Sequence, residues 1–362
     1  MKKFLMSIIF LTGLASCQSP EQKPEPEPAP VPATEAASTP EQEPISDDLR
    51  YPPAPDLPPA PDTLKIAVIS DINASYGTIG YPPNVKRAVQ HIVQGGYDFV
   101  LSSGDLVAGQ KKGLDYEGMW KAFHYQVDDV FFDNNLEFIF APGNHDASAF
   151  PQYAAERYYY QKAFENRRPK SPLLPGSQFP FYYGVIIRDV RVIALDITRP
   201  ISNNDPQLDW LESVLQTDLN PRATIVLAHL PLSPVNIGQF YETAGSTRLL
   251  SLLQKTPKTI YISGHHHIFY PGHIGELRTV AMPALGYGAR KLLGAPAVGG
   301  YVQIIIPPEG QPRVIALVSP TFTRMINVET LPEHLFQASR EDKGMAEFIM
   351  EMLDDSAKES IQ

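Results

Sequence analysis

The sequence has almost no cysteine, and its single cysteine, Cys17, lies close to the amino terminus. A chain with one cysteine cannot form an internal disulfide. The region beyond residue 17 also offers no thiolate to a metal ion. The apolar run at residues 4–14 is too short to span a bilayer comfortably. These absences exclude an internal disulfide and a cysteine-based metal site.

Basic residues are scarce relative to acidic ones, 30 against 40, which gives a formal net charge of −10. Ten of the acidic residues lie in residues 18–62, so the rest of the chain is only mildly acidic. Such a body gives no electrostatic support for gripping long nucleic acids by their backbones. Small phosphorylated substrates remain compatible with this charge, because a bound metal ion makes the local electrostatic potential positive. We therefore expect no specific nucleic-acid binding.

Residues 1–17 have the pattern of an export signal, in which two lysines precede the apolar residues 4–14 and small residues precede Cys17. The segment LASC resembles the lipobox of bacterial lipoproteins, whose cysteine is acylated and becomes the mature amino terminus. An ordinary signal peptide is the alternative. The lipobox implies lipidation at Cys17 and an exported protein anchored to a bacterial membrane. Because Gln18 follows the cysteine, the outer membrane is expected in a Gram-negative host.

Residues 18–62 are dominated by Pro, Glu, Ala and Ser and contain almost no large apolar side chain. This composition cannot bury enough apolar surface to fold, and it predicts a disordered tether. In polyproline II geometry, at about 3.1 Å per residue, the tether would reach on the order of 100 Å. It could hold a folded domain well away from a membrane.

From residue 63 onward, short β-rich runs alternate with helical periodicity, which predicts a layered α/β or α+β domain over residues 63–322. The expected strands are 64–70, 99–103, 138–141, 185–187, 190–196, 224–228 and 259–263. The expected helices are 84–94, 116–132, 153–166, 206–215 and 246–255. Later strands, expected to form the second sheet of a sandwich, are 278–281, 301–306 and 314–318. Residues 323–362 are expected to be a tail with an amphipathic helix.

Polar side chains follow directly after five of the predicted strands. They are Asp71 with Asn73, Asp105, the run Asn144, His145 and Asp146, then His229, and finally His265 with His267. In open α/β sheets, ligands bind at the carboxyl ends of the strands, where these loops converge. Carboxylate, amide and imidazole groups meeting there predict a metal site with oxygen and nitrogen ligands.

The motifs DIN, GD, GNHD, AHLP and GHHH, in this order, resemble those of the calcineurin-like metallophosphoesterase family over roughly residues 64–318. The resemblance implies an α/β fold, α+β by some classifications. The architecture it implies is a four-layer α/β/β/α sandwich with the metal site at the carboxyl ends of the strands. It also implies hydrolysis of a phosphomonoester or phosphodiester by a hydroxide bound to two metal ions.

Carried over by position, the resemblance gives Asp71 and His267 to the first ion, with Asn73 where the family usually has histidine. The ligands implied for the second ion are Asn144, His229 and His265. Asp105 would bridge both ions, since a carboxylate holds two dications about 3.5–4 Å apart. The Asn73 amide is a neutral, weaker ligand, so the first ion is expected to bind less tightly or to be Mn²⁺ or Fe²⁺ rather than Zn²⁺.

The resemblance also implies roles beyond metal binding. His145 would donate a proton to the leaving oxygen or stabilise charge in the transition state, with Asp146 orienting its imidazole. Tyr76 and Arg290 are candidate substrate contacts, since Tyr76 lies on the loop after the first strand and arginine offers paired donors to phosphate. The alternatives are packing of its own loop for Tyr76 and a solvated turn for Arg290.

Together these residues predict an exported phosphatase or phosphodiesterase with two divalent ions, Mn²⁺, Fe²⁺ or Zn²⁺. Its substrate would be a small phosphate ester or a modified macromolecule. The alternative is a non-catalytic, metal-binding adaptor lipoprotein that keeps the fold. Asn73 favours the adaptor, whereas His145 favours the enzyme because an adaptor has no need for it. A nuclease could use the same metal centre, but this sequence lacks the basic surface that would bind the nucleic-acid backbone.

Overall fold

The computed structural model describes residues 46–55, 62–217, 219–235, 242–288, 291–292, 295–296 and 298–331. All of them lie within one compact unit, Ile45–Gln362. The predicted signal peptide with Cys17, most of the predicted tether, Arg290 and the predicted helix of the tail lie outside the described residues. Among the residues that are described, no helix is both long and apolar enough to cross a membrane.

The first sheet is built around three parallel strands, β1 (Leu64–Ile69), β2 (Phe99–Ser102) and β3 (Glu137–Phe140). Their residues are almost all buried, as expected for parallel strands that are covered on both faces. Two late strands, β12 (Gly300–Ile306) and β13 (Arg313–Val318), complete the sheet in the order β13-β12-β1-β2-β3.

The second sheet has the order β4-β5-β6-β7-β9-β8, with β5, β6, β7 and β9 parallel. Its strands are β4 (Tyr183–Ile187), β5 (Val190–Ala194), β6 (Ala223–Leu227), β7 (Thr259–Ser263), β8 (Tyr270–Ile274) and β9 (Leu277–Ala281). Strand β8 was not predicted, because Pro271 and Gly272 are residues that strands usually avoid. As an edge strand, β8 tolerates them. The short hairpin of β10 (Lys291–Leu292) and β11 (Ala295–Pro296) was also missed.

The expectation for the late strands was wrong. Of the three, only β9 joins the second sheet, whereas β12 and β13 return to the first. There β12 pairs antiparallel with β1, from Leu64 opposite Ile306 to Val68 opposite Val302. This pairing satisfies the backbone groups along the outer side of β1, a strand buried at every residue except Lys65, which could not remain an open edge. Its partner lies too far along the chain for a local pattern to reveal it.

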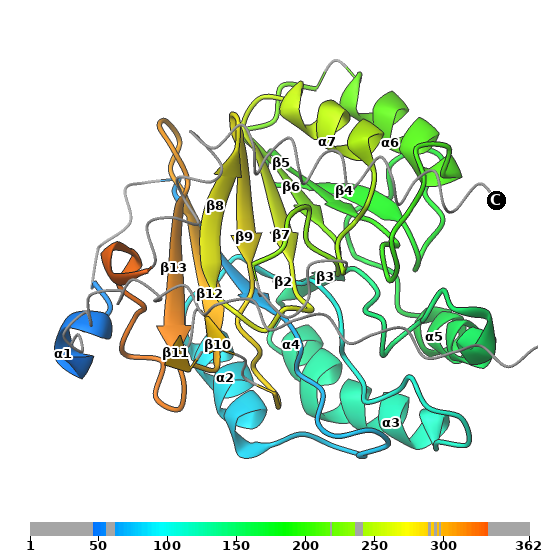
Figure 1. Cartoon of the computed structure of the whole chain (residues 1–362), viewed down its shortest axis with the longest axis horizontal. Helices are drawn as coiled ribbons and strands as arrows, with labels where there is room; N and C mark the ends of the chain where they lie inside the picture. The colour runs from blue at the N-terminus through cyan, green and yellow to red at the C-terminus, as the bar shows by residue number, and fades with distance from the viewer. Residues whose placement is uncertain are drawn as a thin grey trace, which may run out of the picture. The chain divides into compact units, whose positions relative to one another are not determined.

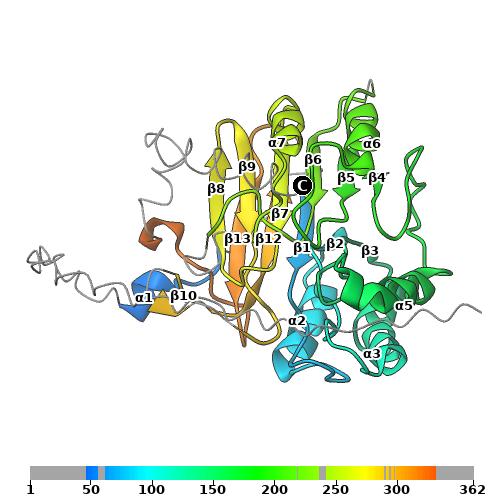
Figure 2. The same ribbon diagram turned by 45° about the vertical axis from the view of Figure 1, so that its right-hand side comes forward.

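Helices cover the outer faces of both sheets, as Figures 1 and 2 show. They are α2 (Pro83–Gln94), α3 (Tyr116–Phe123), the π-helical turn η1 (His124–Asp128), α4 (Asp129–Asp133), η2 (Pro151–Tyr153), α5 (Ala154–Phe164), α6 (Pro206–Leu215) and α7 (Thr247–Gln254). Helices α2 to α5 share a core with the first sheet through residues such as Phe123 and Phe164. Helices α6 and α7 share another with the second sheet. A third core lies between the sheets, so the predicted four-layer α/β/β/α sandwich is confirmed.

Residues 46–55, which we expected to belong to a free tether, instead pack on the chain that follows β13. The Met325 amide donates to the Pro52 carbonyl over 3.0 Å, and Arg324 forms an ion pair of 2.7 Å with Asp48. The short helices in this region are α1 (Asp47–Arg50) and η4 (Val328–Thr330), which lie beside each other in both views (Figures 1 and 2). The folded part of the protein therefore begins earlier and ends later than residues 63–322.

Candidate metal centre

The predicted site residues lie on loops that follow strands of both sheets. Asp71 follows β1, Asp105 follows β2 and His229 follows β6. The backbones of these loops are joined, because the Asp71 amide donates to the Gly104 carbonyl over 3.0 Å. The two sheets are joined as well, since Nδ1 of His229 lies 3.0 Å from the carbonyl of Ser103. The carboxyl ends of the two sheets therefore meet at one place, as the sequence predicted.

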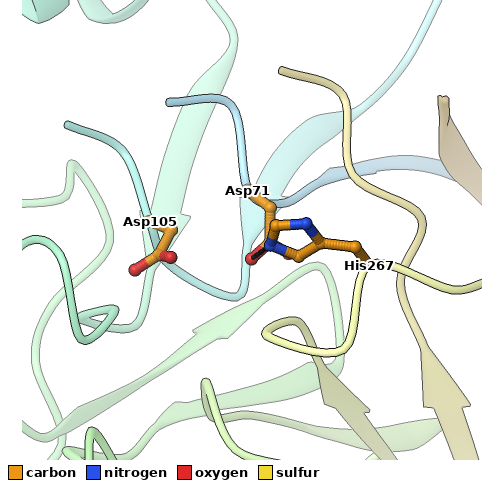
Figure 3. Close-up of side chains that lie close together, drawn as sticks. All are labelled: Asp71, Asp105 and His267. Carbon is orange, nitrogen blue, oxygen red and sulfur yellow. Dashed lines mark ion pairs between the residues drawn. The ribbon is translucent and has the colours of Figure 1, made fainter. Parts of the chain in front are cut away.

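One group at this place consists of Asp71, Asp105 and His267, whose ligand atoms lie within 4.8 Å of one another (Figure 3). Nδ1 of His267 lies 2.8 Å from the Gly288 carbonyl, an acceptor, so Nδ1 carries the proton. Nε2 then presents a lone pair 3.1 Å from Oδ1 of Asp71. Two electron-rich atoms at this distance need a cation between them, either a proton or a metal ion. Both carboxylates are buried, so water does not screen the repulsion between these atoms.

A second group gathers around the side-chain oxygen of Asn144. Nε2 of His229 lies 2.7 Å from Oδ1 of Asn144, and Nδ1 of His265 lies 2.9 Å from the same oxygen. The Asn144 amide nitrogen donates to Oε1 of Gln110 over 2.9 Å, which fixes the amide with its oxygen toward the histidines. Oδ1 of Asp105 is 3.4 Å from Nε2 of His229, so this carboxylate borders both groups. These oxygen and nitrogen donors suit a divalent transition-metal ion.

Electrostatics at the centre follow from burying these groups together. Burial alone would raise the pKa of Asp71 and of Asp105, but the adjacent histidines, chiefly His267 for Asp71 and His229 for Asp105, hold both pKa values below the ordinary range. Burial would lower the pKa of His229, yet Asp105 outweighs it and raises that pKa to about 9. Without a metal ion, a proton on His229 thus balances the carboxylate. Burial lowers the pKa of His265 below its ordinary value.

The backbone at the centre is held in an unfavourable conformation. The left-handed φ values occur at Asp71 (49°), Asp105 (56°), His265 (65°) and His267 (55°). Non-glycine residues rarely adopt such values, and they concentrate at functional sites. Close approach also requires glycine beside them: a Cβ at Gly143 would lie 2.0 Å from the Asp105 amide nitrogen. The GNHD motif therefore needs its glycine for packing as much as its asparagine for chemistry.

His145 lies at the edge of the centre, and its side chain is 19% exposed. Its Nδ1 is 3.0 Å from the Gly109 carbonyl, and its Nε2 is 3.9 Å from Oδ2 of Asp105. The ring is thus oriented by a backbone carbonyl, which corrects the role expected for Asp146. Both oxygens of Asp146 accept backbone amides, those of Leu106 (2.7 Å), Val107 (2.9 Å) and Gly143 (2.8 Å). Asp146 therefore fastens two ligand loops together.

The other predicted residues have mixed outcomes. The ring of Tyr76 lies beside the ring of His145, with 5.1 Å between their centroids, and it is 59% exposed. Asn73 is buried, and its carbonyl accepts the Tyr287 amide over 3.1 Å. Its role as a ligand stays a prediction. Arg290 lies outside the described residues, so its role also stays a prediction.

Two residues at the centre were missed by the sequence analysis. Gln110 fixes the amide of Asn144, and Oε2 of Glu242 lies 2.6 Å from Nε2 of His265. Each is separated from its partner by many residues, 34 and 23 respectively, and neither lies in a recognisable motif. No local spacing could have indicated either one.

Comparison with known proteins agrees with this geometry. The family model for calcineurin-like phosphoesterases matches residues 64–269. The fold resembles a dimetal phosphatase from Danio rerio, with 13% identity and a TM-score of 0.51 over 73% of this chain and 99% of that one. It also resembles the purple acid phosphatase PPD1 from yellow lupin, Lupinus luteus (16%, 0.52, 71% and 52%), and PhoD (11%, 0.51, 74% and 72%). A comparison with curated proteins gives no match.

At such low identities the solved structures establish the fold alone. The family model, in contrast, spans more than half of the chain. It covers every loop of the centre from Asp71 to His267, where the buried carboxylates and histidines converge. This chain therefore belongs to the calcineurin-like phosphoesterase family.

Proposed function

We propose that the protein hydrolyses a phosphate ester with the help of two divalent metal ions, Mn²⁺, Fe²⁺ or Zn²⁺. The observation that carries the proposal is that the metal-binding atoms form two adjacent groups, and that Asp105 borders both. Asp71, His267 and Asn73 would hold the first ion. The second ion would be held by Asn144, His229 and His265. When bound, the ions would supply positive charge that neutralises a phosphate group and lowers the pKa of bound water.

The donors fit such ions for a physical reason. Nε2 of His229 and Nδ1 of His265 lie 2.7 and 2.9 Å from Oδ1 of Asn144, so these acceptor atoms would repel the oxygen unless a proton or a metal ion lay between them. The other ring nitrogen of His229 already faces a carbonyl oxygen, which leaves Nε2 free to bind a metal ion. The centre is therefore built to receive positive charge.

His145 would act on the leaving oxygen. Its Nδ1 is held by the Gly109 carbonyl, so a second proton would reside on Nε2, which faces the Asp105 carboxylate at 3.9 Å. Since the side chain is 19% exposed, the proton could pass to the oxygen of a departing alcohol. Tyr76, beside the same ring, would contact the leaving group.

The proposal extends to location, on the strength of the lipobox-like segment alone. Acylation of Cys17 would anchor the exported protein to a bacterial membrane, and the outer membrane would be its destination in a Gram-negative host. The prediction is that wild-type protein sediments with membranes and that Cys17→Ser protein does not.

The enzymatic proposal is tested with p-nitrophenyl phosphate and bis-p-nitrophenyl phosphate. Metal-stripped protein is supplied with Mn²⁺, Fe²⁺ or Zn²⁺, and the preferred ester separates a monoesterase from a diesterase. Activity should disappear in Asp105→Ala and fall strongly in His145→Ala. Two bound ions without turnover of any phosphate ester would overturn the enzyme and favour the adaptor, the function that Asn73 supports.

A further inference from the structure

His265 differs from the other histidines at the centre in what holds its second ring nitrogen. In His145, His229 and His267, Nδ1 lies 2.8–3.0 Å from a backbone carbonyl. In His265 the corresponding nitrogen, Nε2, lies 2.6 Å from a carboxylate oxygen of Glu242. Glu242 therefore supplies a charged side chain where the other three rings have a neutral carbonyl.

The contact decides which nitrogen of His265 carries the proton. The Glu242 carboxylate can only accept, so Nε2 must donate to it. Nδ1 is then left unprotonated and faces Oδ1 of Asn144 at 2.9 Å, where the second ion would bind. A carboxylate behind a metal-binding histidine fixes the ring orientation and makes the ring a stronger ligand.

Glu242 is held in place by the residues that follow it. Thr243 and Ala244 are buried, although Glu242 itself is 49% exposed. The Ala244 amide donates to the Pro231 carbonyl over 2.8 Å, and the Ala244 carbonyl accepts the Ile201 amide over 2.9 Å. The chain then enters α7. Buried Thr243 and Ala244, the latter hydrogen-bonded through both its amide and its carbonyl, thus place the half-exposed Glu242 carboxylate beside the ring.

We propose that Glu242 is a positioning residue that sets the tautomer of His265 and strengthens binding of the second metal ion. The inference rests on the proposed function for the metal, but the tautomer belongs to the protein itself. Glu242 also places one negative charge beside the site of the second ion and none beside the site of the first. The two ions should therefore respond differently when Glu242 is changed.

Metal affinity provides the first test. In full-length protein, Glu242→Ala should weaken one of the two Mn²⁺ sites by about 10–100-fold, measured by competition with a chelator. Glu242→Gln, which keeps an acceptor but loses the charge, should weaken that site less. The matched control is Glu276→Gln, the same change in the exposed turn between β8 and β9, which should leave both affinities unaltered. Equal weakening of both sites, or of neither, would overturn the proposal.

The tautomer provides the second test and needs no metal. Nitrogen-15 and carbon-13 shifts of the His265 ring, recorded on metal-free protein at mildly alkaline pH, should report a proton on Nε2 in wild type. In Glu242→Ala the population should move toward Nδ1, with an unchanged melting temperature because Glu242 is half exposed. A lower melting temperature with an unmoved tautomer would make the contact merely structural and overturn the proposal.

The two tests separate this inference from the proposed function. Two bound ions without ester hydrolysis would refute the enzyme and leave the Glu242 effect on affinity measurable. A wild-type protein that binds no ion would refute the proposed function and the metal half of this inference together. The tautomer would then decide whether Glu242 positions the ring.

Discussion

The ring of Tyr76 lies against the ring of His145, with 5.1 Å between the two centroids and 42° between the planes. Tyr76 is 59% exposed, so its ring remains accessible to a molecule that approaches the centre. An aromatic leaving group could stack there while its oxygen faces the imidazole. The loop after β1 would then supply both a metal ligand, Asp71, and a substrate contact.

For an aryl phosphate, Tyr76→Ala should raise KM by about 2–10-fold, because an aromatic contact contributes about 0.5–1.5 kcal/mol. Steady-state kinetics on p-nitrophenyl phosphate measure the change. Tyr76→Phe should behave like wild type. Tyr125→Ala, which removes another exposed tyrosine ring on η1, is the matched control. If KM and kcat both stayed at their wild-type values in Tyr76→Ala, the ring would only pack its own loop.

Because Asp105 borders both groups of ligands, Asp105→Asn should release both ions, whereas Asp71→Asn should release only one. Elemental analysis after dialysis measures the ions bound per chain. Each change should lower kcat at least about a hundredfold, since a bound ion contributes several kcal/mol to the transition state. The control is Asp189→Asn, which removes only the exposed ion pair with Arg222. Retention of one ion by Asp105→Asn would contradict a bridging role.

Asp146→Ala should have a larger effect on the stability of the protein than on kcat of the molecules that remain folded. The change leaves three buried backbone amides without an acceptor, which costs at least about 3 kcal/mol in the free energy of unfolding. Denaturant unfolding measures the loss. His145→Ala should give the opposite pattern, a small loss of stability and a fall of about 10²–10⁴-fold in kcat. An Asp146→Ala protein of normal stability with the kinetics of His145→Ala would restore the orienting role first expected for Asp146.

His91 should make stability depend on pH. Burial, with a contribution from Lys65, lowers the pKa of His91 below its ordinary value of 6.5. The unfolded chain therefore binds a proton more readily than the folded one. The stability from a neutral His91, whose Nδ1 is 2.8 Å from the Tyr301 hydroxyl, is present above pH 6.5 and is lost as pH falls through the lowered pKa.

His91→Gln removes this titration while keeping a polar group near Tyr301. Unfolding of metal-free wild type and His91→Gln should be compared from neutral pH downward, so that all other titrating groups are shared. The stability difference in favour of wild type should shrink as pH falls. Parallel curves over the whole range would mean that His91 does not titrate differently in the folded and unfolded states.

The sequence by itself determined the motif residues of the centre. The GNHD, GHHH and related motifs carry their own chemistry, and each stands directly after an apolar run that could only be a buried strand. Since the carboxyl ends of parallel strands meet at one edge, the convergence of Asp71, Asp105, His229 and His267 followed without knowledge of the full topology. The helices were predicted for the same reason, because their periodicity is local.

Tertiary structure alone decided what supports those residues. The return of β12 to β1, the packing of residues 46–55 on the chain near Met325, and the contact of Glu242 with His265 each join segments that lie far apart in the sequence. Asp146 is the clearest case, because its neighbour in the motif is His145 while two of its three partners are backbone amides of another loop, those of Leu106 and Val107. A motif specifies which atoms are available, but hydrogen-bond partners depend on how the loops pack.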